Sequence, residues 1–489
     1  MSGHRTARIL VYTHRWLGVA LGVLFVAWFA SGIVMMYARM PELAAAERLA
    51  RLPVIVPAAI RVAPPLPAGT EMTRLVINSL ETRPVFRITT NGRTQSFFAD
   101  TGDPLPAVDE AQALRIARAF DGGHHVVRYE ARLADADQWS FGVRGRMPLH
   151  RIAIDDAART VLYVTESSGD VVLKTTASGR LWGGAGAVLH WLYFTPFRRL
   201  SKAWAQSIIW LSVAGTLLCI VGILWGLWRF APLRGYRLRN HRQWSPYANW
   251  MRWHHYAGLF FGIVTATWIF SGLLSMDPWN WHPGTAPTRE QRQRVSGGPM
   301  AAGELSVERL QRVIKAFAPS YPKEVEVSKF RGRYYAWAAA GIVSFDEPQF
   351  GPRDQVAADL IVGAATAARP GVTIEGMSWL DRYDSYYYDR SGALSLPVLR
   401  ARYADPQRTW LYFDPRRGVI ARKEERLTRL NRWLYHGLHS LDFPFLYYRR
   451  PLWDIVVIAL SVGGMVLSAT TLTASWRRLR RNAARIGRS

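Results

Sequence analysis

The chain has 489 residues, 49% of them hydrophobic, and a formal net charge of +26 at pH 7. Its main arginine clusters lie at the two ends and between two apolar runs, and this placement argues against nucleic acid as a partner. A single cysteine, Cys219, excludes intramolecular disulfides and a thiolate metal cluster.

Four long apolar runs occupy roughly residues 10–38, 204–230, 253–276 and 452–475. Each is near or above the roughly 20 residues that cross about 30 Å of hydrocarbon as a helix. The first run is much longer than the apolar core of a secretion signal, so we interpret it as a retained span. The sequence therefore predicts a membrane protein with a four-transmembrane-helix bundle.

The three arginine clusters, at the two ends and between the second and third runs, fall on one side of such a bundle, and the positive-inside rule places that side in the cytoplasm. The two long segments on the other side are arginine-rich too, but long domains translocate largely regardless of charge. The predicted parts are a first helix with a cytoplasmic N-terminus (1–40), a first outer domain (41–179), an interfacial helix plus the second helix (180–230), a basic cytoplasmic loop (231–251), a third helix (252–276), a second outer domain (277–428), an interfacial helix plus the fourth helix (429–476) and a basic cytoplasmic tail (477–489).

The first outer segment begins with a Pro-rich stretch at 53–67, which we expect to be an extended linker. Alternating apolar residues at 72–99 predict a hairpin that turns at Asn91-Gly92, and 109–120 has helical spacing. Further strands are expected at HVVRYEARL, WSFGV, HRIAID and TVLYVTE. This mixture indicates a small α+β domain.

The second outer segment repeats this pattern loosely, with helices expected at 305–317 and 355–367. Its run Asp381–Asp389 is rich in tyrosines and acids and has no equally strong counterpart in the first segment. Hard oxygen ligands of this kind can bind a ligand or metal. A strand with tyrosine packing is the interpretation we favour.

The chain contains an internal repeat. A shift of 240 positions carries His14 onto His254 and Ser31 onto Ser271, together with a tryptophan and three glycines. A shift of 249 positions carries His190 onto His439. The repeated unit is a span, an outer domain, an interfacial histidine helix and a second span.

The repeat-matched histidines divide by depth. His14 and His254 begin their spans at the cytoplasmic end, whereas His190 and His439 lie just before theirs at the outer end. Two neutral imidazoles that face each other at one depth are suitable axial ligands for a haem iron. We therefore predict two bis-histidine sites, one near each membrane face.

Several alternatives stay open. His255 and His436 are alternative second members of the two pairs, and any interfacial histidine can instead hydrogen-bond a carbonyl group. A copper or zinc site fits less well, because no carboxylate or thiolate lies nearby in the sequence. The glycines that follow His14 and His254 either leave room for a flat macrocycle or only let helices pack closely.

These motifs resemble a known family. THRWLGVALGVLFVAWFASG and WHHYAGLFFGIVTATWIFSG resemble the first-helix motif of the PepSY-associated transmembrane family, and GVLHWLYF and LYHGLHSLDFPF resemble its later histidine motif. LYVTESSGDVVLK and LYFDPRRGVIARK are similar to the ends of PepSY domains. The resemblance implies a bacterial inner-membrane protein with two periplasmic α+β PepSY-like domains.

Relatives in that family include ferric-siderophore reductases that hold two b-type haems. The resemblance implies haem ligands at His14, His254, His190 and His439. The expected function is a di-haem electron conduit, an oxidoreductase that reduces a periplasmic acceptor, most simply a ferric-siderophore. No flavin or nicotinamide fingerprint is visible, so the electron donor is expected to be membrane quinol or a cytoplasmic reductase. The alternative is a non-catalytic membrane sensor or accessory protein whose PepSY-like domains bind a peptide, protein or metal.

Overall fold

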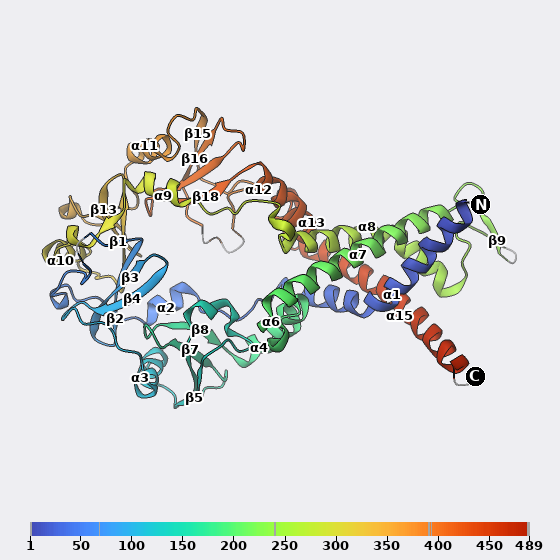
Figure 1. The fold of residues 1–489 in the computed structure, drawn as a ribbon, viewed down its shortest axis with the longest axis horizontal. Coiled ribbons are helices and arrows are strands. Elements are labelled where there is room, and N and C mark those ends of the chain that lie inside the picture. The colour runs from blue at the N-terminus through green and yellow to red at the C-terminus, as the bar shows by residue number, and fades with distance from the viewer. Residues whose placement is uncertain (1, 68, 239–240, 390–391, 393, 487–489) are drawn as a thin grey trace. The chain divides into compact units, whose positions relative to one another are not determined.

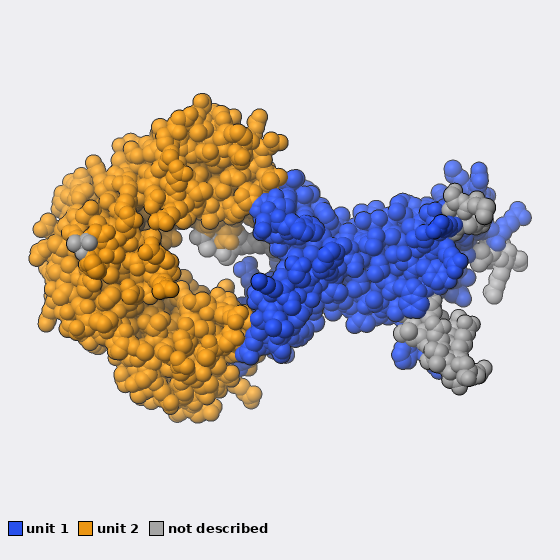
Figure 2. Space-filling model, in the orientation of Figure 1, with its two compact units in different colours: residues 1–40, 178–282, 430–489 blue, residues 41–177, 283–429 orange. Residues whose placement is uncertain are grey.

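The computed structural model describes residues 2–67, 69–238, 241–389, 392 and 394–486. The chain divides into two compact units, which Figure 2 colours separately. Residues 1–40, 178–282 and 430–489 form what we call the helical unit. Residues 41–177 and 283–429 form what we call the sheet unit.

Four long helices that run side by side make up most of the helical unit (Figure 1): α1 (Ser2–Met35), α7 (Ser201–Arg229), α8 (Asn249–Ser275) and α15 (Leu452–Ile486). In the described residues, four helical stretches are long and apolar enough to cross a membrane, namely Arg5–Met35, Ser201–Arg229, Asn249–Ser275 and Leu452–Thr473. The four predicted spans are therefore confirmed as helices of membrane-spanning length.

Large aromatic side chains fill the centre of this bundle. Phe25, Phe29 and Trp268 are buried there together with Cys219. A Cβ atom at Gly464 would lie 2.3 Å from the Phe29 ring, so the absence of a side chain on α15 is what lets α1 approach.

Short helices precede α7 and α15 in the same order. Before α7 come α4 (Ala177–Gly183), a π-helical turn (Gly184–Val188), α5 (Leu189–Trp191) and α6 (Thr195–Arg199). Before α15 come α12 (Arg426–Asn431), a π-helical turn (Arg432–Gly437), α13 (Leu438–Ser440) and α14 (Pro444–Tyr447). Both α5 and α13 are followed by a leucine in the left-handed region, Leu192 at φ 51° and Leu441 at φ 49°.

A short hairpin joins α7 to α8. Its strands are β9 (Tyr236–Leu238) and β10 (His241–Gln243), and it lies with the N-terminus at one end of the bundle (Figure 1). Helices α6 and α13 lie at the other end. The helical unit therefore has two distinct ends.

The sheet unit contains a six-stranded antiparallel sheet built from both outer segments, in the order β14-β13-β12-β2-β3-β4. The strands are β2 (Arg74–Leu80), β3 (Arg83–Thr90), β4 (Arg93–Phe98), β12 (Glu324–Phe330), β13 (Arg333–Ala338) and β14 (Gly341–Ser344). The segments meet where β2 pairs with β12, with Ile77 opposite Val325. The two outer segments therefore share one sheet and one hydrophobic core.

Each outer segment also forms a four-stranded antiparallel sheet of its own. The first contains β5 (Val127–Leu133), β6 (Leu149–Ile154), β7 (Val161–Thr165) and β8 (Val171–Thr175), and α3 (Glu110–Asp121) packs on it. The second contains β15 (Ile374–Leu380), β16 (Val398–Tyr403), β17 (Trp410–Asp414) and β18 (Val419–Glu424), and α9 (Arg289–Ser296) and α11 (Ala358–Ala368) pack on it. The smaller elements of the sheet unit are α2 (Ala45–Arg51), β1 (Glu71–Met72), β11 (Met300–Ala301) and α10 (Val307–Lys315).

The segment WSFGV, predicted as a strand, is instead part of a 3₁₀ helix (Ser140–Arg146). One Asp137 carboxylate oxygen accepts hydrogen bonds from the backbone N–H groups of Trp139 and Ser140, each at 3.0 Å. These local hydrogen bonds use backbone donors that a β-ladder would need, so the strand prediction was wrong.

The Pro-rich stretch at 53–67 is not the extended linker that its composition predicted. It contains a 3₁₀ turn (Pro57–Ala59), and the Ile55 and Ile60 side chains that flank this turn are fully buried in the core of the six-stranded sheet. Burial of two isoleucines favours a packed segment over a free one.

Candidate functional site

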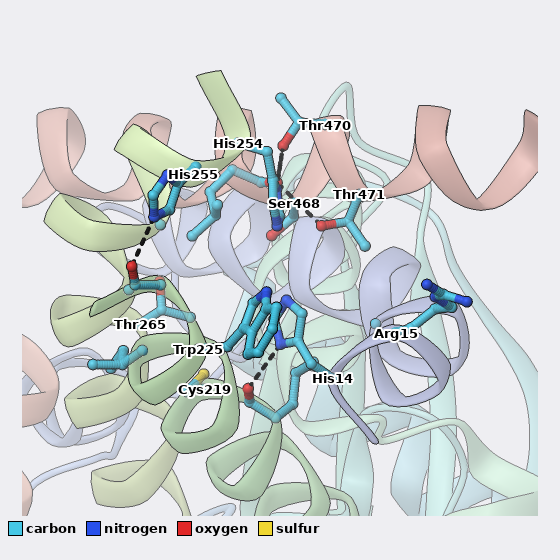
Figure 3. A pocket seen from close by; sticks show the side chains of 18 of the residues that line it. His14, Arg15, Cys219, Trp225, His254, His255, Thr265, Ser468, Thr470 and Thr471 are labelled. Carbon is cyan, nitrogen blue, oxygen red and sulfur yellow. Dashed lines mark hydrogen bonds between the residues drawn. The ribbon is translucent and has the colours of Figure 1, made fainter. Parts of the chain in front are cut away.

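His14 on α1 and His254 on α8 line one cavity of about 430 Å³ in the helical unit (Figure 3). Their ring centres are 6.1 Å apart, and the ring planes are tilted by 46°. Because one histidine comes from each half of the chain, this pair forms only when α1 and α8 pack in the same bundle.

The hydrogen bonds of this pair define where the imidazole protons lie. His14 Nδ1 is 3.2 Å from the carbonyl oxygen of Leu218, which can only accept. His254 Nδ1 is 2.8 Å from the Thr470 hydroxyl oxygen, and that hydroxyl donates its own proton to the Leu467 carbonyl oxygen at 2.6 Å. Both imidazoles therefore donate from Nδ1, which in a neutral ring leaves the lone pair on Nε2.

His190 on α5 and His439 on α13 form a second pair, with ring centres 6.1 Å apart and ring planes at 73°. Each Nδ1 lies 3.1–3.2 Å from a serine oxygen and from a tryptophan carbonyl oxygen. For His190 these belong to Ser31 and Trp28. For His439 they belong to Ser271 and Trp268. Both serine hydroxyls donate to carbonyl groups of their own helices, so their oxygens accept from the imidazoles. Here too the lone pair of the neutral ring is on Nε2.

Burial, and to a lesser extent the neighbouring His439 imidazole, lowers the pKa of His190 to about 4. The His190 side chain is therefore neutral at pH 7, which is the protonation state in which a histidine binds a metal.

The two alternative histidines lie differently. Both ring nitrogens of His255 are in hydrogen bonds, Nε2 with the Gly226 carbonyl oxygen and Nδ1 with the Ser245 hydroxyl, each at 2.8 Å. The His436 ring packs on Tyr435, with ring centres 4.4 Å apart. The structure thus brings His254 against His14 and His439 against His190.

Glycines shape the cavity around His14. A Cβ atom at Gly222 would lie 2.5 Å from His14 Cε1, so the imidazole occupies the space of a missing side chain on α7. Gly18 and Gly22 also line the cavity, yet a Cβ atom at either would first meet side chains of α15, at 3.2 and 3.1 Å. These two glycines therefore serve helix packing as well as the cavity.

The acceptors for the imidazoles were not identified from the sequence, although part of the signal was present. Ser31 and Ser271 match under the 240-residue shift, three positions after matched tryptophans. Thr470 carries no such signal. Under the 249-residue shift, Leu218, whose carbonyl oxygen accepts from His14, corresponds to Leu467. The Thr470 hydroxyl lies between the Leu467 carbonyl oxygen and the His254 imidazole.

The tyrosine- and acid-rich run Asp381–Asp389 is a loop after β15, so the strand prediction was wrong. Asp384 accepts a hydrogen bond from the backbone N–H of Tyr387 at 2.6 Å and pairs with Arg400 at 2.9 Å. The fully buried Tyr387 ring stacks on Tyr412, with ring centres 4.9 Å apart. Over the part of the chain that the structure describes, no group of three or more His, Cys, Asp or Glu side chains could hold a metal ion.

Comparison with known families identifies the PepSY-associated TM region. The model of the PepSY-associated TM region matches residues 11–345, well over half of the chain. The matched range includes His14, His190 and His254 and ends before His439. No curated protein matches the chain.

Proposed function

Because the chain belongs to the family of the PepSY-associated TM region, we propose that it is a di-haem b electron conduit of the bacterial inner membrane. It would act as an oxidoreductase that reduces a periplasmic acceptor. The observation that carries this proposal is the presence, within the helical unit, of two histidine pairs with the same ring separation, in which each imidazole is hydrogen-bonded through Nδ1.

The separation of the rings fits iron ligation. An imidazole nitrogen bonds a first-row metal at about 2.0–2.1 Å, and the ring centre lies about 1.1 Å beyond it, so two imidazoles on opposite sides of one iron have ring centres about 6 Å apart. The two observed separations are both 6.1 Å. Two histidines with no further protein ligand suit a haem iron, since the macrocycle supplies the other four ligands.

The side chains around each pair have a definite role in this proposal. Acceptors at Nδ1 hold each imidazole in the tautomer that presents Nε2 and make that nitrogen a stronger ligand. When bound, a bis-histidine haem supplies one-electron transfer. On α1, His14 belongs to the first pair and Ser31 contacts His190 of the second pair. These two positions are separated by 17 residues, or about 25 Å of helix at 1.5 Å per residue.

The direction of electron flow follows from the proposed orientation. The arginine-rich termini would lie in the cytoplasm and the sheet unit in the periplasm. The donor would be membrane quinol or a cytoplasmic reductase, and the acceptor a ferric-siderophore, whose Fe(III) takes one electron to become Fe(II). His14 and His254 would hold the haem nearer the donor, and His190 and His439 the haem nearer the acceptor.

A reduced-minus-oxidised visible spectrum of the purified protein, with haem quantified per chain, tests the proposal. We expect two b-type haems in the wild type and about one each in His14→Ala and His190→Ala, because either substitution removes one axial ligand. His124→Ala, which changes an exposed histidine of the sheet unit, is the control and should keep both haems.

Full haem content in both His14→Ala and His190→Ala would show that these residues are not ligands. A colourless protein from cells supplied with ample haem would reject the redox function and favour the membrane sensor or accessory protein.

A further inference from the structure

The cavity around His14 and His254 changes character along the bundle. Phe25 and Gly262 line its part nearer the centre of the helices, several turns from the β9–β10 hairpin. Arg15 and Arg229 line its other part, and Arg229 is the last residue of α7. The cavity therefore has an apolar part near the centre of the bundle and a basic part near the end that carries the β9–β10 hairpin.

These two arginines have no acidic partner in the described part of the chain. The Nε atoms of Arg15 and Arg229 are buried and have no hydrogen-bond partner. Their guanidinium groups lie over aromatic rings, 5.2 Å from the centre of Tyr12 and 5.7 Å from the centre of Trp225. A ring face does not saturate the N–H groups of a guanidinium, so both arginines can donate hydrogen bonds to an anionic partner.

We propose that Arg15 and Arg229 bind the carboxylate groups of the ligand that occupies this cavity. The ligand is an amphipathic, planar molecule with an apolar body between His14 and His254 and an acidic edge at the arginines. This inference rests on the proposed function, in which the ligand is haem and the acidic edge is its pair of propionates. A guanidinium suits this task because its planar N–H groups match a carboxylate in two parallel hydrogen bonds.

A neighbouring histidine does not compete for the same role. The His255 ring also lines the cavity, but its two nitrogens bond the Gly226 carbonyl oxygen and the Ser245 hydroxyl. Among the described residues that line the cavity, the two guanidinium groups are therefore the cations available to an anionic ligand.

Titration of the full-length protein with two iron porphyrins tests this assignment. The protein is purified in detergent from haem-deficient cells and carries His190→Ala, so that only the pair His14 and His254 is measured. Ferric protoporphyrin IX and its dimethyl ester are added separately, and the Soret band reports binding. We expect the free acid to bind about tenfold or more tightly than the ester, since charge-assisted hydrogen bonds are lost with the ester.

Arg15→Gln and Arg229→Gln should each weaken binding of the free acid by about tenfold and leave binding of the ester unchanged. Arg8→Gln is the matched control. Arg8 is an exposed arginine of the same helix that also lies over Tyr12, at 5.6 Å, and we expect both affinities to be unchanged.

Equal affinities for the acid and the ester in the protein with both arginines would overturn the inference, while leaving the proposed function intact. An equal loss for both porphyrins in the arginine variants would do the same and would indicate a structural role. A comparable effect of Arg8→Gln would also overturn the inference, because it would show that general positive surface charge, and not these two arginines, favours the free acid. No Soret change with either porphyrin would instead count against the proposed function.

Discussion

Each of the four paired imidazoles of the helical unit is oriented through a hydrogen bond at Nδ1. The acceptors of His190 and His439 match in the two halves of the chain, whereas those of His14 and His254 differ. His14 reaches a backbone carbonyl oxygen directly, whereas His254 reaches the Thr470 hydroxyl, which in turn donates to a carbonyl group. A hydroxyl is easily removed by substitution, whereas a carbonyl is not. Within the pair of His14 and His254, the orientation of His254 can therefore be tested by substituting a side chain.

Thr470→Val removes the acceptor of His254 Nδ1 and preserves the shape of the side chain. We expect haem to bind the pair His14 and His254 about 10–100-fold more weakly, the usual effect of losing a partner that orients a ligand. The measurement is a haem titration of the full-length protein that carries His190→Ala.

Thr473→Val is the control, because the Thr473 hydroxyl donates to the Thr470 carbonyl oxygen. An unchanged affinity in Thr470→Val would show that the His254 hydrogen bond does not support ligation.

At the scale of elements, the turns that carry His190 and His439 have the same construction. Each follows a π-helical turn and ends at a leucine with positive φ, Leu192 or Leu441. A non-glycine residue in this region costs on the order of 1 kcal/mol or more and persists only where its surroundings impose it. The indole N–H groups of Trp204 and Trp453 donate to the carbonyl oxygens of the residues just before these leucines, Trp191 and Ser440, each at 2.9 Å.

The pairing of β2 with β12 joins two segments that are far apart in the sequence. Ile77 and Val325 face each other in the register and are both fully buried. Beside them, Arg48 binds both Glu324 carboxylate oxygens at 2.6 and 2.9 Å. Burial raises the pKa of Glu324, but the Arg48 guanidinium, with smaller contributions from Asn78 and Arg74, outweighs burial and holds that pKa below its usual range.

Ile77→Ala and Val325→Ala should therefore destabilise the same cooperative unit, although they lie in different segments. Removing buried methyl and methylene groups of an isoleucine costs about 2–5 kcal/mol, and the smaller valine should cost less. We expect both variants to lower the midpoint of one thermal unfolding transition in detergent. Because the residues are in contact, their effects should not be additive.

Val126→Ala, at a residue with 65% of its surface exposed, is the control and should leave the midpoint unchanged. Two separate transitions, each sensitive to only one of the two substitutions, would contradict the shared sheet.

For the whole molecule, four spans place both termini on the same side of a membrane. The loop that carries the β9–β10 hairpin joins the second span to the third and so lies on the side of the termini. The Asn91-Gly92 turn belongs to the segment between the first and second spans and lies on the opposite side. The arginine distribution predicts that the termini are cytoplasmic.

Cysteine labelling in spheroplasts tests this topology. In a Cys219→Ser background, Asn91→Cys should react with a membrane-impermeant maleimide in intact spheroplasts. Leu233→Cys, at a residue with 91% of its surface exposed, should react only after lysis. Labelling of Leu233→Cys in intact spheroplasts would reverse the orientation.

The sequence by itself determined the features that depend on neighbouring residues. Apolar length gave the four spans, and helical spacing gave α3, which ends within one residue of its prediction. The Asn91-Gly92 turn, with φ of 49° and 77°, is the hairpin that the dipeptide indicates. The same local motifs were enough to predict the family, which the family match confirms.

Only the tertiary structure decided the features that depend on distant contacts. Consecutive residues point about 100° apart on a helix, so the choice between His254 and His255 depends on where α1 and α7 pack. The sheet shared by β2 and β12 could not be predicted, because strand alternation specifies a face but not a partner. The Thr470 contact depends in the same way on the position of α15 beside α8. Local periodicity determines elements, and the packing of distant elements determines which side chains meet.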